Sequence, residues 1–130
     1  MIYVFPLIIP ASTPASAPLI VPCQLSSGTI VAGQFQFPGG PLGLAHVYVR
    51  NGLNQVWPAN PEQDFATDNE TIEWEDEYPL LNPPFQLQAY GYNLDTLNPH
   101  TITLRVVILP QVSPSQIASQ VQLLLGASGG

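Results

Sequence analysis

A run of acidic side chains is the densest group of potentially reactive residues in this sequence. Eight of the nine acidic residues of the chain fall between Glu62 and Glu77. Carboxylates that are close together can bind Ca²⁺, because hard cations prefer oxygen ligands, and the candidate ligands here are Asp64, Asp68 and Glu70. The spacing does not match an EF-hand loop. We therefore expect no required metal and interpret the run as a solvated rim that discourages pairing between strand edges.

No other set of residues predicts a catalytic centre. His46 and His100 are isolated in the sequence, and we interpret them as surface or turn residues rather than metal ligands. The single cysteine, Cys23, is expected to be a buried thiol rather than a nucleophile paired with a histidine. Two of the carboxylates could form a glycosidase pair, but nothing in the sequence identifies a cleft. We therefore expect no catalytic residue and no cofactor.

Aromatic residues offer a second kind of chemistry, because their rings stack on the faces of sugars. We expect Trp74 in the core of the protein, whereas Trp57, which precedes a proline, is the better candidate for exposure. A carbohydrate- or receptor-binding module of a virion or cell surface is therefore the alternative function. The candidate aromatic residues are Trp57, Trp74, Tyr78, Tyr90 and Tyr92.

The charge content of the chain excludes some partners and favours others. Of 130 residues, 2 are basic and 9 are acidic, and the net charge is -7. Average usage would give roughly 32 charged residues, so we expect part of the surface to be covered by a partner. Binding to a nucleic-acid backbone requires clustered Lys and Arg, and the only cations here are Arg50 and Arg105. We therefore expect no nucleic acid.

These residues are predicted to lie on a small all-β domain over residues 25–110, a β-sandwich or jelly-roll-like fold. Apolar and polar residues alternate along Thr101–Ile108 and Phe85–Tyr90, which is the period of a half-buried strand. Asn51-Gly52 predicts a two-residue hairpin, and several short strands between turns are typical of all-β sandwiches. The expected core residues are Phe35, Val47, Trp74, Leu87, Leu104 and Val106.

Residues 1–24 are predicted to form an extended, apolar, proline-rich arm. Its β-prone ends are separated by a spacer of small residues with prolines, which favours an extended chain. One interpretation is a first strand of the same sandwich, and the other is an arm that adds a strand to a neighbouring subunit. Pro6 and Pro10 interrupt the apolar run well short of the roughly 20 residues of a membrane span, so we expect no membrane insertion. The arm residues assigned to a partner interface are Ile2, Val4, Phe5, Leu7 and Ile8.

Residues 111–130 contain no charge and are predicted to form a short helix followed by a frayed end. Ser113-Pro114 is a helix-start signal, and the apolar residues that follow recur at helical spacing. The helix is expected to pack either on its own sandwich or on a partner. Ile117, Val121 and Leu124 complete the expected partner interface.

The layout of the chain resembles that of small virion proteins, namely the decoration (cement) and minor capsid proteins of tailed bacteriophages. The resemblance lies in the uncharged arm, the predicted sandwich with Phe37–Gly40 and Asn98–Arg105, and the apolar tail. It implies a symmetric oligomer, commonly a trimer, bound to the major capsid protein or another virion protein after assembly in the host cytoplasm. We therefore expect a non-enzymatic structural assembly protein located in a virion.

Overall fold

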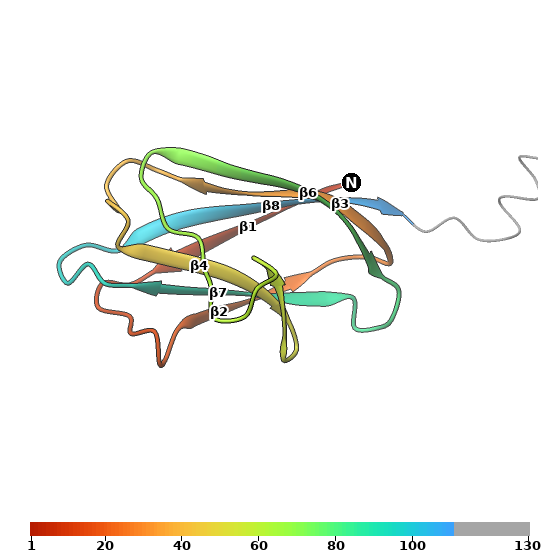
Figure 1. Ribbon diagram of the computed structural model, residues 1–130, viewed down its shortest axis with the longest axis horizontal. Coiled ribbons are helices and arrows are strands. Elements are labelled where there is room, and N and C mark those ends of the chain that lie inside the picture. The colour runs from red at the N-terminus through yellow and green to blue at the C-terminus, as the bar shows by residue number, and fades with distance from the viewer. Residues whose placement is uncertain (111–130) are drawn as a thin grey trace, which may run out of the picture.

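A computed structural model describes residues 1–110, in which eight β-strands make up the regular structure (Figure 1). Within these residues there is no helix long and apolar enough to span a membrane. The helix expected after residue 110, with the interface candidates Ile117, Val121 and Leu124, lies outside the described residues. In chain order the strands are β1 (Ile2–Ile9), β2 (Leu19–Gln24), β3 (Gly28–Phe37), β4 (Ala45–Asn51), β5 (Asn54–Trp57), β6 (Glu70–Leu80), β7 (Gln86–Asn93) and β8 (His100–Pro110).

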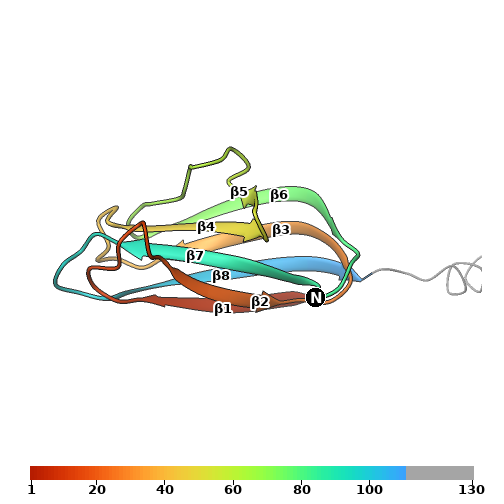
Figure 2. The same cartoon turned by 90° about the horizontal axis from the view of Figure 1, so that it is seen from below.

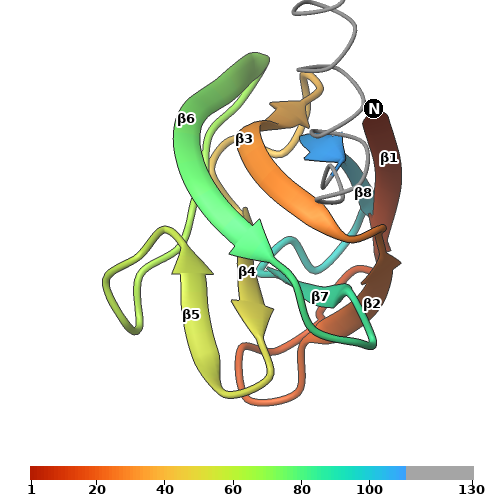
Figure 3. The same cartoon turned by 90° about the vertical axis from the view of Figure 1, so that its right-hand side faces the viewer.

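The strands form two antiparallel four-stranded sheets that pack face to face (Figure 3). Sheet A has the order β1-β8-β3-β6, and sheet B has the order β2-β7-β4-β5 (Figure 2). Strands β1 and β2 lie together on one side of the sandwich, and β5 and β6 lie together on the other (Figure 3). The predicted all-β sandwich is therefore confirmed.

The core lies between the two sheets and follows the alternation seen in the sequence. In β8, Ile102, Leu104, Val106 and Ile108 are fully buried while the residues between them face outward. Of the expected core residues, Phe35, Val47, Leu87, Leu104 and Val106 are buried as predicted. Trp74 differs, because its half-buried indole packs against the margin of the core on edge strand β6.

Residues 1–24 do not form a separate arm in the structure. All eight residues of β1 pair with β8, and all six residues of β2 pair with β7. Leu7 and Ile9 are fully buried, and burial of each such side chain contributes about 1.5–3 kcal/mol. Residues 1–24 therefore belong to the sandwich of their own chain, which is the first of the two interpretations. No domain boundary lies at residue 25.

Prolines mark three of the four edge strands. Pro6 lies in β1, Pro22 in β2 and Pro79 in β6, and among the described strands each of these three has a neighbour on one side only. Proline lacks the N–H group that an inner strand donates, so it is confined to edges, strand ends and bulges. The fourth edge strand, β5, is only four residues long.

The hairpin predicted at Asn51-Gly52 is present, but its turn is shifted by one residue. Asn51 pairs with Asn54, so the two turn residues are Gly52 and Leu53. Gly52 has φ +61°, a backbone conformation that glycine adopts without steric cost. The hairpin brings β5 alongside β4 at the edge of sheet B.

Candidate functional site

The acidic run lies mainly on β6, the edge strand of sheet A. Five of its eight residues fall within Glu70–Leu80, and all five are exposed. Acidic side chains along an edge repel a second strand that approaches it. This position agrees with the interpretation of the run as a rim that discourages edge pairing.

The three candidate metal ligands are occupied by separate hydrogen bonds. Asp64 accepts from the Tyr92 hydroxyl at 2.7 Å, Asp68 accepts from the backbone N–H groups of Gly40 and Leu42, and Glu70 accepts from a threonine hydroxyl. Within residues 1–110 no group of three or more His, Cys, Asp or Glu side chains is arranged to hold a metal ion. The structure therefore does not bring the candidate ligands together.

Both histidines contact carboxylates. His46 Nδ1 lies 2.8 Å from Asp64 Oδ1, and His100 Nε2 lies 2.8 Å from Asp95 Oδ2. Asp95 also accepts hydrogen bonds from the backbone N–H groups of Leu97 and Asn98. These bonds, chiefly that from Leu97 and then that from His100, lower the pKa of Asp95 to about 2. The Asp95–His100 pair thus fixes the turn between β7 and β8.

The expected exposure of Trp57 is wrong. Trp57 is 5% exposed, and its indole N–H donates to Asp76 Oδ2 at 2.9 Å. The Trp57 and Trp74 rings pack against each other at 5.3 Å, and Tyr78 meets Trp57 edge to face. These three aromatic residues fill the side of the sandwich between β5 and β6, so they do not form a sugar-binding platform.

The other two aromatic candidates, Tyr90 and Tyr92, lie on the outer face of sheet B. Each pairs in register with a residue of β4: Tyr90 with Tyr48, and Tyr92 with His46. The Tyr48 and Tyr90 rings stack at 5.0 Å, and the His46 and Tyr92 rings stack at 4.5 Å. Burial raises the pKa of Tyr48 above its ordinary value of 10.0, and burial together with the bond to Asp64 raises that of Tyr92 further.

Arg50 completes this outer face. Its guanidinium carbon lies 5.1 Å from the centre of the Tyr48 ring and 5.2 Å from that of Tyr90, distances at which a cation and an aromatic ring attract each other. The sequence by itself does not single out His46, Tyr48 and Arg50 as one group. They alternate with Ala45, Val47 and Val49, and this alternation is the signal that places them together on the outer face.

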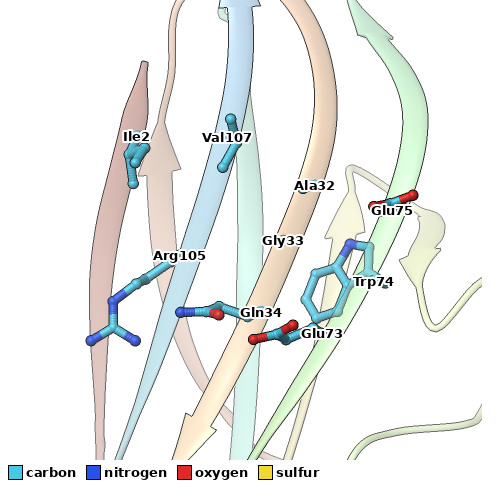
Figure 4. A pocket seen from close by; sticks show the side chains of 9 residues that line it. All are labelled: Ile2, Ala32, Gly33, Gln34, Glu73, Trp74, Glu75, Arg105 and Val107. Atoms are coloured by element: carbon cyan, nitrogen blue, oxygen red, sulfur yellow. The ribbon is translucent and has the colours of Figure 1, made fainter.

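The outer face of sheet A contains a cavity of about 640 Å³ (Figure 4). Ile2 and Val107 line its apolar side, and Trp74 lines the opposite side. Gln34 connects two of the three charged residues of the cavity: its amide oxygen accepts from Arg105 at 3.1 Å and its amide nitrogen donates to Glu73 at 3.2 Å, in the orientation that satisfies both. Arg105, the second of the two arginines, is therefore linked to the Glu73 carboxylate through an amide.

The residues assigned to a partner interface divide along β1. Ile2, Val4 and Ile8 are exposed by 68%, 54% and 62%, so they are available to a partner. Leu7 is fully buried in its own core, and Phe5 is half-buried. The assignment is therefore wrong for Leu7, because the alternation of β1 turns this side chain toward sheet B.

The backbone of β1 has unpaired groups along its outer edge. Met1 and Ile108 exchange two hydrogen bonds, which in an antiparallel ladder makes every second residue face the partner strand. Tyr3, Phe5, Leu7 and Ile9 therefore bond to β8. The backbone groups of Ile2, Val4, Pro6 and Ile8 point away from β8, and within residues 1–110 no strand lies on that side of β1.

Comparison with known proteins identifies no family for this chain. No family model matches it, and no curated protein matches it. Among solved structures, the chain is similar to the crystal structure of the Yersinia pseudotuberculosis-derived mitogen, with 9% sequence identity and a TM-score of 0.48. The match covers 89% of this chain and 92% of the mitogen chain. A likeness at this level carries no information about function.

Proposed function

We propose that this protein is a non-enzymatic assembly subunit of a virion, which joins a neighbouring subunit or capsid protein through the outer edge of β1. The observation that carries the proposal is the contrast between the two edges of sheet A. Edge strand β6 carries five acidic residues, whereas edge strand β1 carries none and exposes Ile2, Val4 and Ile8. Only one edge of this sheet is protected by charge.

An edge without charged side chains favours the addition of another strand, and Pro6 is the single gap in its outward N–H groups. The outward N–H groups of Ile2, Val4 and Ile8 and the neighbouring carbonyls form a ready template for pairing. Burial of the three exposed side chains would contribute roughly 5–9 kcal/mol as an upper range, which is of the same order as the cost of association. The apolar groups of the partner would add to this, so a stable contact through β1 is energetically reasonable.

Two broader features support the placement in a virion. The strand order β1-β8-β3-β6 and β2-β7-β4-β5 fits an eight-stranded jelly roll, an architecture common among viral capsid and lectin domains. The low number of charged residues fits a surface that is largely covered after assembly. We expect a homo-oligomer, a trimer by the resemblance to decoration proteins, that binds the major capsid protein.

The test compares a charge on β1 with the same charge elsewhere. Val4→Lys places a cation on the outer edge, whereas Leu53→Lys places one at a turn residue that is 99% exposed. Light scattering after size exclusion should show oligomers for the parent and Leu53→Lys proteins and monomers for Val4→Lys, with unchanged circular dichroism. A monomeric parent protein, or a Val4→Lys variant that still associates, would overturn self-association through β1.

The location in a virion is tested separately. Particles purified by density gradient from the culture that produces this protein should contain it in fixed proportion to the major shell protein. Its absence from every particle fraction would overturn the virion location, while leaving the role of the β1 edge in self-association open to the scattering measurement.

A further inference from the structure

We infer that the outer face of sheet B binds a saccharide that carries a carboxylate group. This face is on the opposite side of the sandwich from the outer face of sheet A, and it does not include β1. The inference is therefore independent of assembly through the β1 edge. We call this surface the tyrosine face, and it consists of His46, Tyr48, Arg50, Gln88, Tyr90 and Tyr92.

The tyrosine face is built from three consecutive cross-strand pairs. His46 pairs with Tyr92, Tyr48 with Tyr90, and Arg50 with Gln88. All six side chains are half-buried, so each is held by its neighbours while part of it stays accessible to a ligand. Such a surface loses little conformational freedom on binding, because its side chains are already ordered.

Arg50 is the residue that selects for an anion. Its Nε donates to Gln55 Oε1 at 3.3 Å, and within residues 1–110 no carboxylate lies within salt-bridge distance of its guanidinium. The protein has nine acidic residues and only two arginines, so the chain has enough carboxylates to provide Arg50 with an ion-pair partner. A guanidinium held against rings with its terminal N–H groups available matches the geometry of a carboxylate, which it binds through two parallel hydrogen bonds.

A cavity next to Arg50 provides space for a ligand. It has a volume of about 440 Å³ and is lined by Arg50, Asn54, Gln55 and Glu62, among others. This volume lies within the usual range for small-molecule sites, about 300–1,000 Å³. The polar part of its wall consists of the Arg50 guanidinium, the two side-chain amides of Asn54 and Gln55 and one carboxylate, that of Glu62, so it offers both donors and acceptors.

The mixture of polar groups favours a saccharide over other acids. Each sugar hydroxyl can donate and accept hydrogen bonds. A side-chain amide can also do both, because its N–H donors and its carbonyl acceptor lie in one plane. On this face Gln88 Oε1 accepts from the Gly52 N–H at 2.9 Å, which fixes the orientation of its amide. The Tyr48 and Tyr90 rings supply apolar surface for the C–H groups of a sugar. A nucleic acid is not favoured, because its repeated phosphates require several cations.

The network around Asp64 fixes the far end of the tyrosine face. Asp64 accepts from the Tyr92 hydroxyl at 2.7 Å and contacts His46 Nδ1 at 2.8 Å. With its proton committed to Asp64, the Tyr92 hydroxyl oxygen is left to accept from a ligand. The face therefore has an anion-binding end at Arg50 and a hydroxyl-binding end at Tyr92.

The test uses the two arginines of the chain as a matched pair. Isothermal titration calorimetry with sialyllactose, with oligogalacturonate and with lactose should show binding of at least one acidic saccharide and weaker or absent binding of lactose. Arg50→Gln should weaken binding of the acidic saccharide at least about tenfold. Arg105→Gln makes the same charge change on the opposite sheet and should leave binding unchanged.

Three results would overturn the inference. These are no binding of either acidic saccharide, equal binding of lactose, or an equal loss of affinity in Arg50→Gln and Arg105→Gln. Thermal melts of both variants check that each is folded. If Arg50→Gln is not folded, Arg50→Lys replaces it, because lysine keeps the charge but lacks the planar fork. It should also weaken binding, and unchanged affinity would equally overturn the inference.

Discussion

The indole N–H of Trp57 donates to Asp76 Oδ2 at 2.9 Å, and this bond joins the two sheets along one side of the sandwich. Trp57 ends β5, the edge strand of sheet B, and Asp76 lies on β6, the edge strand of sheet A. Asp76 lies on the same face of β6 as Trp74 and Tyr78, and the rings of these two residues also pack against Trp57. Asp76 is therefore a specific acceptor for a buried donor as well as a member of the acidic rim.

Removal of the Asp76 carboxylate should destabilise the sandwich. Asp76→Ala leaves the buried Trp57 N–H without an acceptor, which we expect to cost about 1–3 kcal/mol in the free energy of unfolding. Asp76→Asn keeps an acceptor oxygen and should cost less. Urea denaturation measures both. Glu75→Ala, on the outward side of the same strand, serves as the control and should change stability by less than about 0.5 kcal/mol.

Gly33 should be intolerant of a side chain. It pairs with Trp74, and a Cβ on Gly33 would come within 2.5 Å of the Trp74 ring. The indole cannot easily move, because Phe35 and Phe65 also pack against it. We expect Gly33→Ala to cost about 1–3 kcal/mol and to alter tryptophan fluorescence. In Gly39→Ala the nearest atom would be 3.9 Å away, so an equal loss there would contradict this explanation.

The hydrogen-bond register of β1 predicts opposite effects of proline at adjacent positions. The N–H of Phe5 bonds to β8, whereas that of Val4 points away from it. Phe5→Pro should therefore cost about 3 kcal/mol or more, and Val4→Pro clearly less. Thermal denaturation compares the two variants. Equal destabilisation would mean that β1 pairs with β8 in the other register.

Stability at acidic pH should depend on Asp95. Its pKa is about 2 in the folded protein against an ordinary 3.8, so below about pH 4 the unfolded chain binds more protons than the folded one. The stabilisation from Asp95 is complete above the unfolded pKa and is lost as the pH falls through about 2. The melting temperature should therefore fall less steeply between about pH 4 and 2 in Asp95→Asn than in the parent protein. Parallel profiles would contradict the assignment.

The Cys23 thiol should be inert in the folded protein. Cys23 is 1% exposed, and burial raises its pKa to about 11 from 9.0. The thiolate is the reactive form, so at pH 8 a disulfide reagent should modify the native protein far more slowly than the protein in denaturant. Rapid modification without denaturant would show that β2 separates from β7 under native conditions.

Several features of this protein could be read from the sequence because they depend on neighbouring residues alone. The alternation of Ile102, Leu104 and Val106 with polar residues fixes which face of β8 is buried, since side chains on a strand point alternately to opposite sides. The hairpin after Asn51 also depends only on residues that are adjacent in the sequence, although its turn is shifted by one residue from the predicted position.

Only the tertiary structure decided which strands became neighbours. Period-two alternation gives the face of a residue but not its partner across the sheet, because that pairing depends on contacts between distant parts of the chain. Tyr48 and Tyr90 stack although 41 residues separate them in the sequence, and Arg50 lies against both rings. In the same way, the pairing of β1 with β8 made residues 2–9 an edge of their own sandwich, and the packing of β5 beside β6 buried Trp57.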